Sequence, residues 1–258
     1  MDASIVATID ARLAAVETEH SVRIPWAIES GSRAWGFPSP DSDYDCRFFF
    51  VRERDAYLSL WPQRDVIETP LDRIFDVNGW DLAKAVRLLA KGNATVTEWL
   101  RSPIVYTGDE SFRDGMLELA SSVYDPALIG RHYLHVGRQQ LEKFGDNVSL
   151  KRVFYALRPA ATLRWLRWNT GVPPMDLASL LAECSPPFGL AAAVERLVEL
   201  KAVTREMGSG SVPDSIMGFI DDELTLAKSR YEDADRKPSP EVTRLCDAYF
   251  QGVLATLD

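Results

Sequence analysis

The sequence predicts a mixed α+β fold in which an amino-terminal unit of strands and helices precedes an all-helical remainder. Three observations lead to this prediction. Short apolar and aromatic stretches typical of strands occur before about residue 107 and are not found after it. Beyond that point, apolar residues recur three or four positions apart, as on one face of a helix. Adjacent prolines at 173–174 and 186–187 separate these helical stretches.

The amino-terminal unit begins with a predicted helix over residues 3–19, where apolar residues follow helical spacing. Strands are expected over residues 22–29 and 44–51, because both stretches are short and rich in β-branched or aromatic residues. Residues 33–42 between them contain one glycine and two prolines, so they are expected to include a loop.

Another strand is expected within residues 66–77, and Asn78-Gly79 is expected to end it because this dipeptide favours a turn. A helix is predicted next, near residues 82–90. The remaining predicted helices span residues 110–122, 126–144, 150–169, 174–183, 189–206, 214–230 and 240–256.

The composition is that of a globular protein, with 46% apolar and 26% charged residues. The 29 basic and 38 acidic residues give a net charge of −9, so a polyanion would have to meet a local basic surface. Cys46, Cys184 and Cys246 lie far apart, and the sequence has no apolar stretch long enough to span a membrane. With no secretory pattern at the start, we expect a cytoplasmic protein without a membrane partner.

Two acidic residues stand at the start of the second predicted strand. Asp43 and Asp45 are two positions apart, so a strand places both carboxylates on one face and Tyr44 on the other. Adjacent like charges cost stability, and a divalent cation would remove that cost. Carboxylate oxygens suit Mg²⁺ or Mn²⁺. A calcium-binding helix-loop-helix motif is excluded, because Cys46 and Arg52 replace its required glycine and glutamate.

A Gly-Ser pair precedes these acids. Glycine at position 31 lets the backbone approach a ligand closely, and successive amides with the Ser32 hydroxyl can hold phosphate oxygens. Ten residues separate this pair from Asp43. A phosphate cradle followed by metal-binding carboxylates is what phosphoryl or nucleotidyl transfer requires.

The Gly-Ser pair, the ten-residue spacing and the Asp-Tyr-Asp sequence at 43–45 resemble the signature of the DNA polymerase beta superfamily of nucleotidyltransferases. Residues 31–48 as a whole resemble one branch, the RlaP or YcgL type, which is linked by name to RNA repair. Residues 76–82 and 151–159 resemble the same branch, so the likeness extends over most of the chain. Cys46 stands where that branch is expected to have valine, on the strand face opposite the carboxylates.

The resemblance implies a polymerase-beta-type nucleotidyltransferase domain over residues 1–105, with its sheet and flanking helices. It also implies that the helical domain, residues 106–258, closes one side of the active-site cleft. The implied reaction is of the EC 2.7.7 type: a nucleoside monophosphate passes from a nucleoside triphosphate to a hydroxyl acceptor, and the family link favours an RNA end. Because the chain is acidic, a short RNA end or a small acceptor fits better than a long duplex.

The superfamily uses a third carboxylate on a neighbouring strand. Asp76 is our candidate, because it is expected to close a strand just before the Asn-Gly turn. Asp72 and Asp81 are the alternatives, and Asp81 can instead cap the following helix. The resemblance then implies that two Mg²⁺ ions bind Asp43, Asp45 and the third carboxylate. This hypothesis would fail if a buried arginine already neutralised the pair and left no room for an ion.

Basic residues gather in the helical part. Residues 149–175 contain five lysines or arginines and no acid. Lys151, Tyr155 and Arg158 fall on one helix face, which we predict to bind the triphosphate tail or an RNA phosphate, although a solvated helix surface is the alternative. Arg33 is included in the predicted nucleotide site; like Arg47, it could neutralise phosphate or pair with an acid.

Two other functions stay open at this point. The acceptor could be a protein hydroxyl, as in AMPylation, or the protein could bind a nucleotide without turnover. The carboxylate pair argues against a pure binding protein, which needs none.

Overall fold

The computed structural model describes residues 1–258 except residues 71, 73, 145–147, 205–211, 235–236 and 257–258. The chain packs as two units. We call the first the sheet unit; it comprises Met1–Gly31, Asp43–Val123 and Lys237–Asp258. The second, the helical unit, comprises Ser32–Ser42 and Tyr124–Arg236. Packing thus divides the chain at four places, whereas the sequence-based division has one boundary near residue 105.

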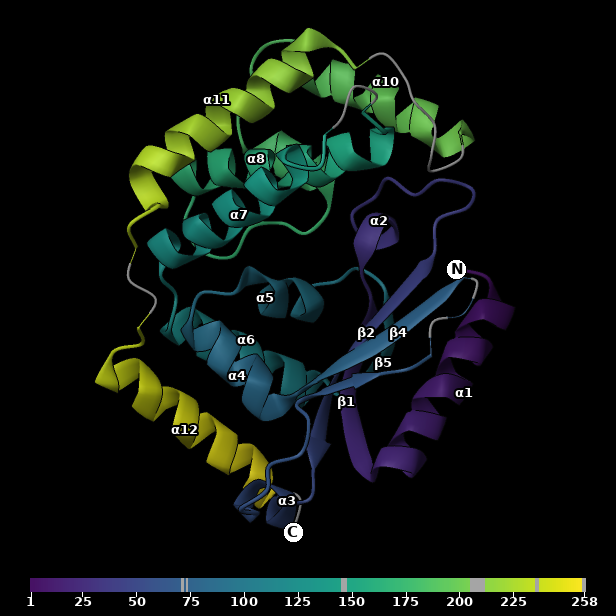
Figure 1. The fold of residues 1–258 in the computed structure, drawn as a ribbon, viewed down its shortest axis with the longest axis vertical. Coiled ribbons are helices and arrows are strands. Elements are labelled where there is room, and N and C mark those ends of the chain that lie inside the picture. Colours follow the sequence, from purple (N-terminus) through teal and green to yellow (C-terminus); the bar gives the residue numbers. More distant parts are fainter. Residues whose placement is uncertain (71, 73, 145–147, 205–211, 235–236, 257–258) are drawn as a thin grey trace. The chain divides into compact units, whose positions relative to one another are not determined.

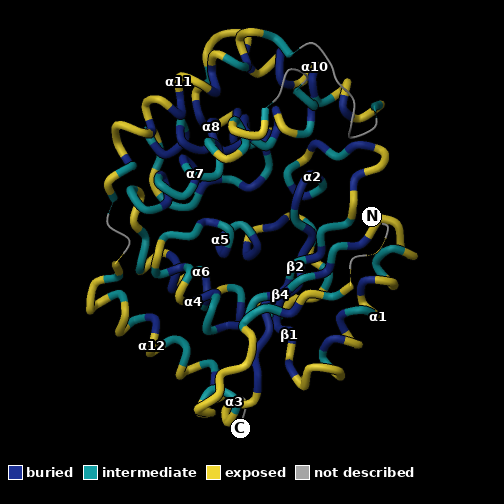
Figure 2. Tube along the Cα trace, viewed as in Figure 1, coloured by how far each residue is buried: buried dark blue, intermediate teal, exposed yellow. Residues whose placement is uncertain are grey.

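The sheet unit is built on five strands in the order β3-β4-β2-β1-β5 (Figure 1). Strands β2 and β4 run parallel, and the other neighbours are antiparallel. The central strands β1 and β2 are largely buried (Figure 2). The strand bounds are β1 (Val22–Glu29), β2 (Tyr44–Arg52), β3 (Val66–Glu68), β4 (Phe75–Asp81) and β5 (Val105–Gly108).

Each face of the sheet is covered by helices, because apolar side chains alternate along the strands. Phe48 and Phe50 are buried with the inner side of α1 (Ala3–His20). Phe49 and Val51 are buried on the other face, with residues from α4 (Leu82–Ala90), α5 (Ala94–Leu100), α6 (Glu110–Ser122) and α12 (Pro240–Ala255). A short helix, α3 (Arg54–Leu58), follows β2.

The helical unit contains no strand among its described residues. Helices α7, α8 and α11 pack on one another, and their shared core includes the apolar residues of α8. Its helices are α7 (Pro126–Leu141), α8 (Leu150–Trp168), α9 (Leu177–Glu183), α10 (Leu190–Val203) and α11 (Asp214–Tyr231). A one-turn helix, α2 (Gly31–Ala34), spans the junction between the units.

The mixed α+β class and the helical remainder are confirmed. The prediction that Asn78-Gly79 ends a strand is wrong, because both residues lie inside β4. A Cβ on Gly79 would come within 2.1 Å of the Phe48 ring, so this glycine makes room for an aromatic side chain instead of a turn. The predicted strand over 66–77 is in fact two strands, β3 and β4. Sequence patterns also missed α3, α5 and the edge strand β5.

None of the helices in the described part of the chain combines the length and the apolar character needed to cross a bilayer.

Candidate active site

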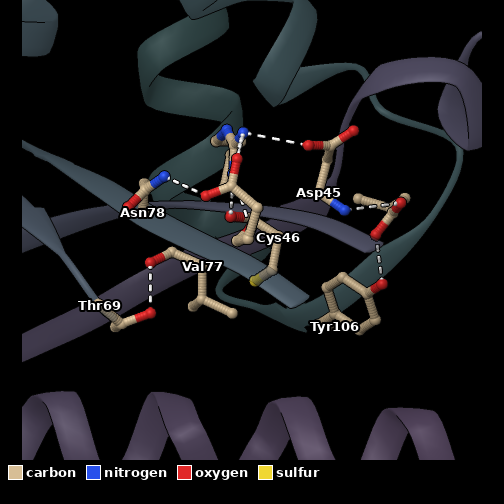
Figure 3. Close-up of polar contacts among 9 residues, drawn as sticks. Asp45, Cys46, Thr69, Val77, Asn78 and Tyr106 are labelled. Atoms are coloured by element: carbon tan, nitrogen blue, oxygen red, sulfur yellow. Dashed lines mark hydrogen bonds and ion pairs between the residues drawn. The ribbon is translucent and has the colours of Figure 1, made fainter. Parts of the chain in front are cut away.

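Two of the predicted site carboxylates lie side by side in the sheet unit. Asp45 on β2 and Asp76 on β4 are register partners in the parallel pair. Their side chains are 24% and 29% exposed, so solvent reaches both carboxylates. Asn78, two positions along β4, donates a hydrogen bond from its amide to Asp76 Oδ1 (Figure 3). The sheet therefore places two negative charges from distant parts of the sequence on one face.

Arg47 lies between these carboxylates. It is two positions after Asp45 on β2 and so shares its face. Its Nη2 atom donates to Asp45 Oδ1 at 3.2 Å and to Asp76 Oδ2 at 2.6 Å. Of the two roles considered for Arg47, pairing with acids is thus the one observed. The Arg47 side chain is 18% exposed, so the carboxylates that it contacts are not sealed from solvent.

Gly31 fits closely against Asp45. Its φ angle is +61°, and a Cβ at this position would lie 2.1 Å from Asp45 Oδ2. The backbone N–H of Ser30 also donates to the Asp45 carbonyl at 2.8 Å. The sequence predicts Gly31 as a phosphate contact, because glycine lets the backbone approach a ligand closely. In the structure, the Asp45 carboxylate fills the space that a side chain at position 31 would need.

A fully buried acid, Glu29, supports Asp45 from the neighbouring strand and was missed by sequence reasoning. Its Oε1 accepts the backbone N–H of Asp45 at 3.1 Å, and its Oε2 accepts the Tyr106 hydroxyl at 2.5 Å. The only sequence signal was a charged residue at the end of the apolar strand β1. Tyr106 comes from β5, and only the pairing of β1 with β5 brings it to Glu29.

Cys46 and Val77 point the opposite way from Asp45 and Asn78, toward α1 (Figure 3). Cys46 therefore lies on the face opposite the Asp45 carboxylate, as predicted. Burial raises the pKa of its thiol, so Cys46 is a packing residue. The replacement of valine by cysteine leaves the polar face of the strand unchanged.

Asp43 lies one residue before β2 and is exposed. The strand begins at Tyr44, as predicted, so Asp43 lies at its edge and not within it. Asp43 stays a predicted metal ligand. Among the described residues, no three His, Cys, Asp or Glu side chains are grouped closely enough to hold a metal ion.

The two alternatives to Asp76 have other contacts. Asp72 accepts the backbone N–H groups of Ile74 and Phe75 and pairs with Arg12, so its carboxylate holds the start of β4. Asp81 caps α4 by accepting the N–H of Ala83 at 2.8 Å, as the sequence suggested. Burial raises the pKa of the Asp81 carboxyl. Asp76 does not close a strand, because it is the second residue of β4, but it is the candidate that lies beside Asp45.

The donor chemistry of the pair fits a divalent cation. Asp45 and Asp76 supply hard carboxylate oxygens, which Mg²⁺ and Mn²⁺ prefer. The Arg47 Nη2 atom shows that a positive group fits between one oxygen of each. The two carboxylates, which are two of the three predicted ligands, thus already share one cationic group, the Arg47 guanidinium.

Ser32 and Arg33 belong to the helical unit, in the segment 32–42. The Ser32 side chain is buried, and its hydroxyl donates to Ser42 Oγ at 3.1 Å. Arg33 donates from Nη2 to the Ser42 carbonyl at 2.7 Å. Ser32 and Arg33, which are both predicted to contact phosphate, therefore bond to Ser42 and hold the two ends of this segment together. Within the helical unit, the same segment is anchored by Lys201, whose Nζ donates to the Phe37 carbonyl at 2.7 Å.

The predicted basic face of α8 gathers around Trp35. The Tyr155 ring meets it edge-on at 5.0 Å between centroids, and the Arg158 guanidinium lies 4.8 Å from its ring centre. Arg158 is buried and donates from Nε to the Met175 carbonyl at 2.9 Å. Lys151 is half-buried, with Nζ 5.9 Å from the Tyr155 ring. Of the three residues, Arg158 is thus built into the fold, and Lys151 is the cation nearer to solvent.

Two further cations of this segment are used internally. Arg164 and Arg167 both donate to Glu223 Oε1, at 3.0 and 2.8 Å. Glu223 is 3% exposed, so this cluster lies inside the helical unit. Part of the positive charge that the sequence places in residues 149–175 is therefore compensated by Glu223 within the fold.

Comparison with known proteins identifies the family. Residues 5–251 match the model of RlaP, an RNA repair pathway DNA polymerase beta family. The chain belongs to this family. The protein YcgL of Bacillus subtilis (strain 168), itself named as uncharacterized, is 37% identical to this RlaP-family chain over 211 residues, which cover 81% of each sequence. The match extends through both units, and membership in a polymerase beta family indicates a nucleotidyltransferase in general.

A solved structure aligns with nearly the whole RlaP-family chain. It is that of a nucleotidyltransferase-like protein from Exiguobacterium sibiricum 255-15, with 12% identity and a TM-score of 0.33, covering 96% of this chain and 90% of its own.

Proposed function

We propose that the protein is a divalent-metal-dependent nucleotidyltransferase that transfers a nucleoside monophosphate from a nucleoside triphosphate to a hydroxyl acceptor, with an RNA end as the favoured acceptor. The main support is the pair of solvent-accessible carboxylates, Asp45 and Asp76, beside Gly31 in a chain of the RlaP family. The family description favours RNA as the acceptor class.

Asp45, Asp76 and Asp43 would hold the metal, Mg²⁺ or Mn²⁺. Bound there, two ions would neutralise polyphosphate charge and lower the pKa of the acceptor hydroxyl. Glu29 and Gly31 fix the backbone and side chain of Asp45, while Asn78 orients the Asp76 carboxylate. These neighbours keep the carboxylates in one arrangement before the substrate arrives, as electrostatic catalysis requires.

The reaction itself exchanges two phosphorus–oxygen bonds. The acceptor oxygen forms a bond to the α-phosphorus, and the bond from that phosphorus to the α,β-bridging oxygen breaks, so pyrophosphate leaves. We assign the acceptor proton to the Asp76 carboxylate. Ser32, Arg33, Lys151, Tyr155 and Arg158 stay the proposed nucleotide-binding residues, with Lys151 as the cation for the triphosphate and Arg158 as the support for Trp35 and Tyr155.

Incubation with each of four α-labelled nucleoside triphosphates, Mg²⁺ and either short RNA with a free 3′ hydroxyl or total cell protein tests the proposal. Label should move to RNA. Label on protein instead of RNA would identify a protein hydroxyl as the acceptor. Nucleotide binding without transfer to any acceptor would indicate a nucleotide sensor.

Asp76→Asn should lose transfer because it removes the metal ligand and proton acceptor. Asp72→Asn is the matched control, since the Asp72 carboxylate bonds to the backbone at the start of β4 and lies outside the carboxylate pair. Wild-type transfer by Asp76→Asn, or equal loss in both variants, would contradict the assignment of Asp76.

A further inference from the structure

The Arg47 guanidinium is held by two different sets of contacts. Its Nη1 atom donates to the backbone carbonyls of Cys46 at 2.9 Å and Asp76 at 2.7 Å. Its Nη2 atom donates to the carboxylates of Asp45 and Asp76. One nitrogen is therefore anchored to the sheet backbone, and the other contacts the two carboxylates.

This division has an electrostatic reason. Asp45 and Asp76 are register partners on adjacent strands, where like charges repel. Arg47 supplies a positive charge between them, and its planar guanidinium can bond to both carboxylates at once. Arg47 therefore offsets the repulsion between the two carboxylates by contacting one oxygen of each.

A divalent ion between Asp45 and Asp76 needs the same oxygen atoms that Arg47 Nη2 now contacts. Metal entry must break the two Nη2 contacts, whereas the Nη1 contacts to backbone carbonyls can persist. Arg47 would then stay beside the site with an unsatisfied donor nitrogen. A triphosphate oxygen is the anion that an accompanying nucleotide would offer to it.

We propose that Arg47 is a built-in counter-cation that competes with the divalent metal for Asp45 and Asp76, so that nucleotide binding raises metal affinity by taking over Arg47. This inference rests on the proposed function, because it concerns the same carboxylate pair. It assigns Arg47 the role of a positioning residue that keeps the pair intact without metal. The coupling is reciprocal: the metal must raise nucleotide affinity by the same factor.

The test is Mn²⁺ binding, measured by electron paramagnetic resonance with and without a non-hydrolysable triphosphate. In the absence of nucleotide, Arg47→Gln should bind Mn²⁺ roughly tenfold more tightly than the wild type, the equivalent of losing one charge-assisted competitor. The triphosphate should tighten Mn²⁺ binding to the wild type and have a smaller effect on Arg47→Gln. Arg12→Gln is the control, because it breaks an Arg–Asp pair elsewhere in the sheet unit and should leave Mn²⁺ affinity unchanged.

Thermal unfolding gives a second readout. Without metal, Arg47→Gln should melt below the wild type because the carboxylates repel, and saturating Mn²⁺ should raise its melting temperature more than that of the wild type. Arg47→Lys keeps the charge but loses the planar fork, so its Mn²⁺ affinity should lie between the two. Arg47→Lys serves as the test if Arg47→Gln does not fold.

If folded Arg47→Gln or Arg47→Lys binds Mn²⁺ no more tightly than the wild type, the proposed competition between Arg47 and the metal is wrong. That result would leave the proposal of nucleotidyl transfer by the wild type standing. Tighter binding by the variants together with no transfer by the wild type to any acceptor would support the exchange and contradict the proposed function.

Discussion

Two arginine–carboxylate clusters, one in each unit, use the same chemical groups for different ends. In the sheet unit, one arginine serves two carboxylates, and the three side chains are 18–29% exposed. In the helical unit, two arginines serve Glu223, which is 3% exposed. The first cluster places two carboxylates on one arginine, and solvent reaches all three side chains. The second has a surplus positive charge around a buried acid.

The contrast shows that charge sign and accessibility together separate a site from a structural cluster. Arg164 also donates from Nε and Nη2 to the carbonyl of Ser185, so it ties the segment after α9 to α8. Removing a charge from the Glu223 cluster leaves a buried charged side chain without its counter-charge. Removing one from the Asp45 cluster leaves groups that water can solvate.

The largest expected effect is on activity, in Asp45→Asn. Transfer should fall on the order of a hundredfold or more, because the metal ligand that Glu29 and Gly31 hold in place loses its charge. The free energy of unfolding should change by less than about 1 kcal/mol, since the Arg47 pair is partly solvated. Single-turnover rates and urea unfolding measure the two quantities. Asp43→Asn should lose transfer as well, and undiminished turnover in both variants would refute the carboxylate site.

Glu223→Gln should show the reverse pattern. The free energy of unfolding should fall by about 3 kcal/mol, because two arginines lose a buried counter-charge. Transfer per folded molecule should stay at the wild-type level. Asp222→Asn, at the exposed neighbouring position of α11, is the control in urea unfolding. If the two variants unfold at the same urea concentration, the helical cluster contributes nothing to stability.

Gly31→Ala should lower the free energy of unfolding by about 2 kcal/mol, because an alanine side chain meets Asp45 and the backbone has a positive φ. Gly36→Ala is the comparison: its φ is +88°, but no atom lies within 4 Å of the added Cβ, so about 1 kcal/mol is expected. Denaturant curves of both report the difference. Equal losses would show that Asp45 moves aside without cost.

Lys151→Ala should raise the KM for the triphosphate roughly tenfold through loss of one charge-assisted contact, with little change in stability. Arg158→Ala should instead lower the melting temperature, because Arg158 is buried against Trp35. Steady-state kinetics and thermal unfolding distinguish the two. An unchanged KM in Lys151→Ala would make its side of α8 a solvated surface.

The smallest effect is expected at the cysteines. Cys46, Cys184 and Cys246 are all buried, and burial raises the pKa of each thiol, that of Cys184 to about 11. The reactive thiolate is therefore scarce in the native protein at pH 8. A chromogenic disulfide reagent should label none of them within minutes at that pH and all three after denaturation. Fast labelling of the native protein would show that the packing around at least one of the three cysteines opens readily.

The elements that carry the site follow from local sequence patterns. Helical spacing and strand alternation predicted α1, β1 and β2 within a residue or two, and the spacing from Gly31-Ser32 to the Asp-Tyr-Asp sequence led to Gly31 and Asp45 as candidate site residues. Asp76 was selected for a mistaken local reason. Gly79 was interpreted as a turn residue, whereas it makes room for Phe48, a contact that depends on the pairing of β2 with β4.

The rest depends on contacts between distant residues. Glu29 meets Tyr106 only because β5 pairs with β1, and Arg47 meets Asp76 only through the parallel register of β2 and β4. Local periodicity contains no information on either pairing. The same holds for Arg164 and Glu223, which are 59 positions apart. Sequence patterns therefore located the basic residues but could not tell which of them the fold neutralises.

The sheet unit is assembled from three stretches of chain, and this has a consequence for biosynthesis. Cys246 and Leu254 of α12 are buried in the core that covers one face of the sheet, yet the ribosome makes them only after the whole helical unit. A nascent chain that ends at Val123 therefore has a sheet with one incompletely covered apolar face. We expect the sheet unit to complete its folding only after α12 has emerged, which makes chaperones or rapid translation most valuable during synthesis of residues 124–236.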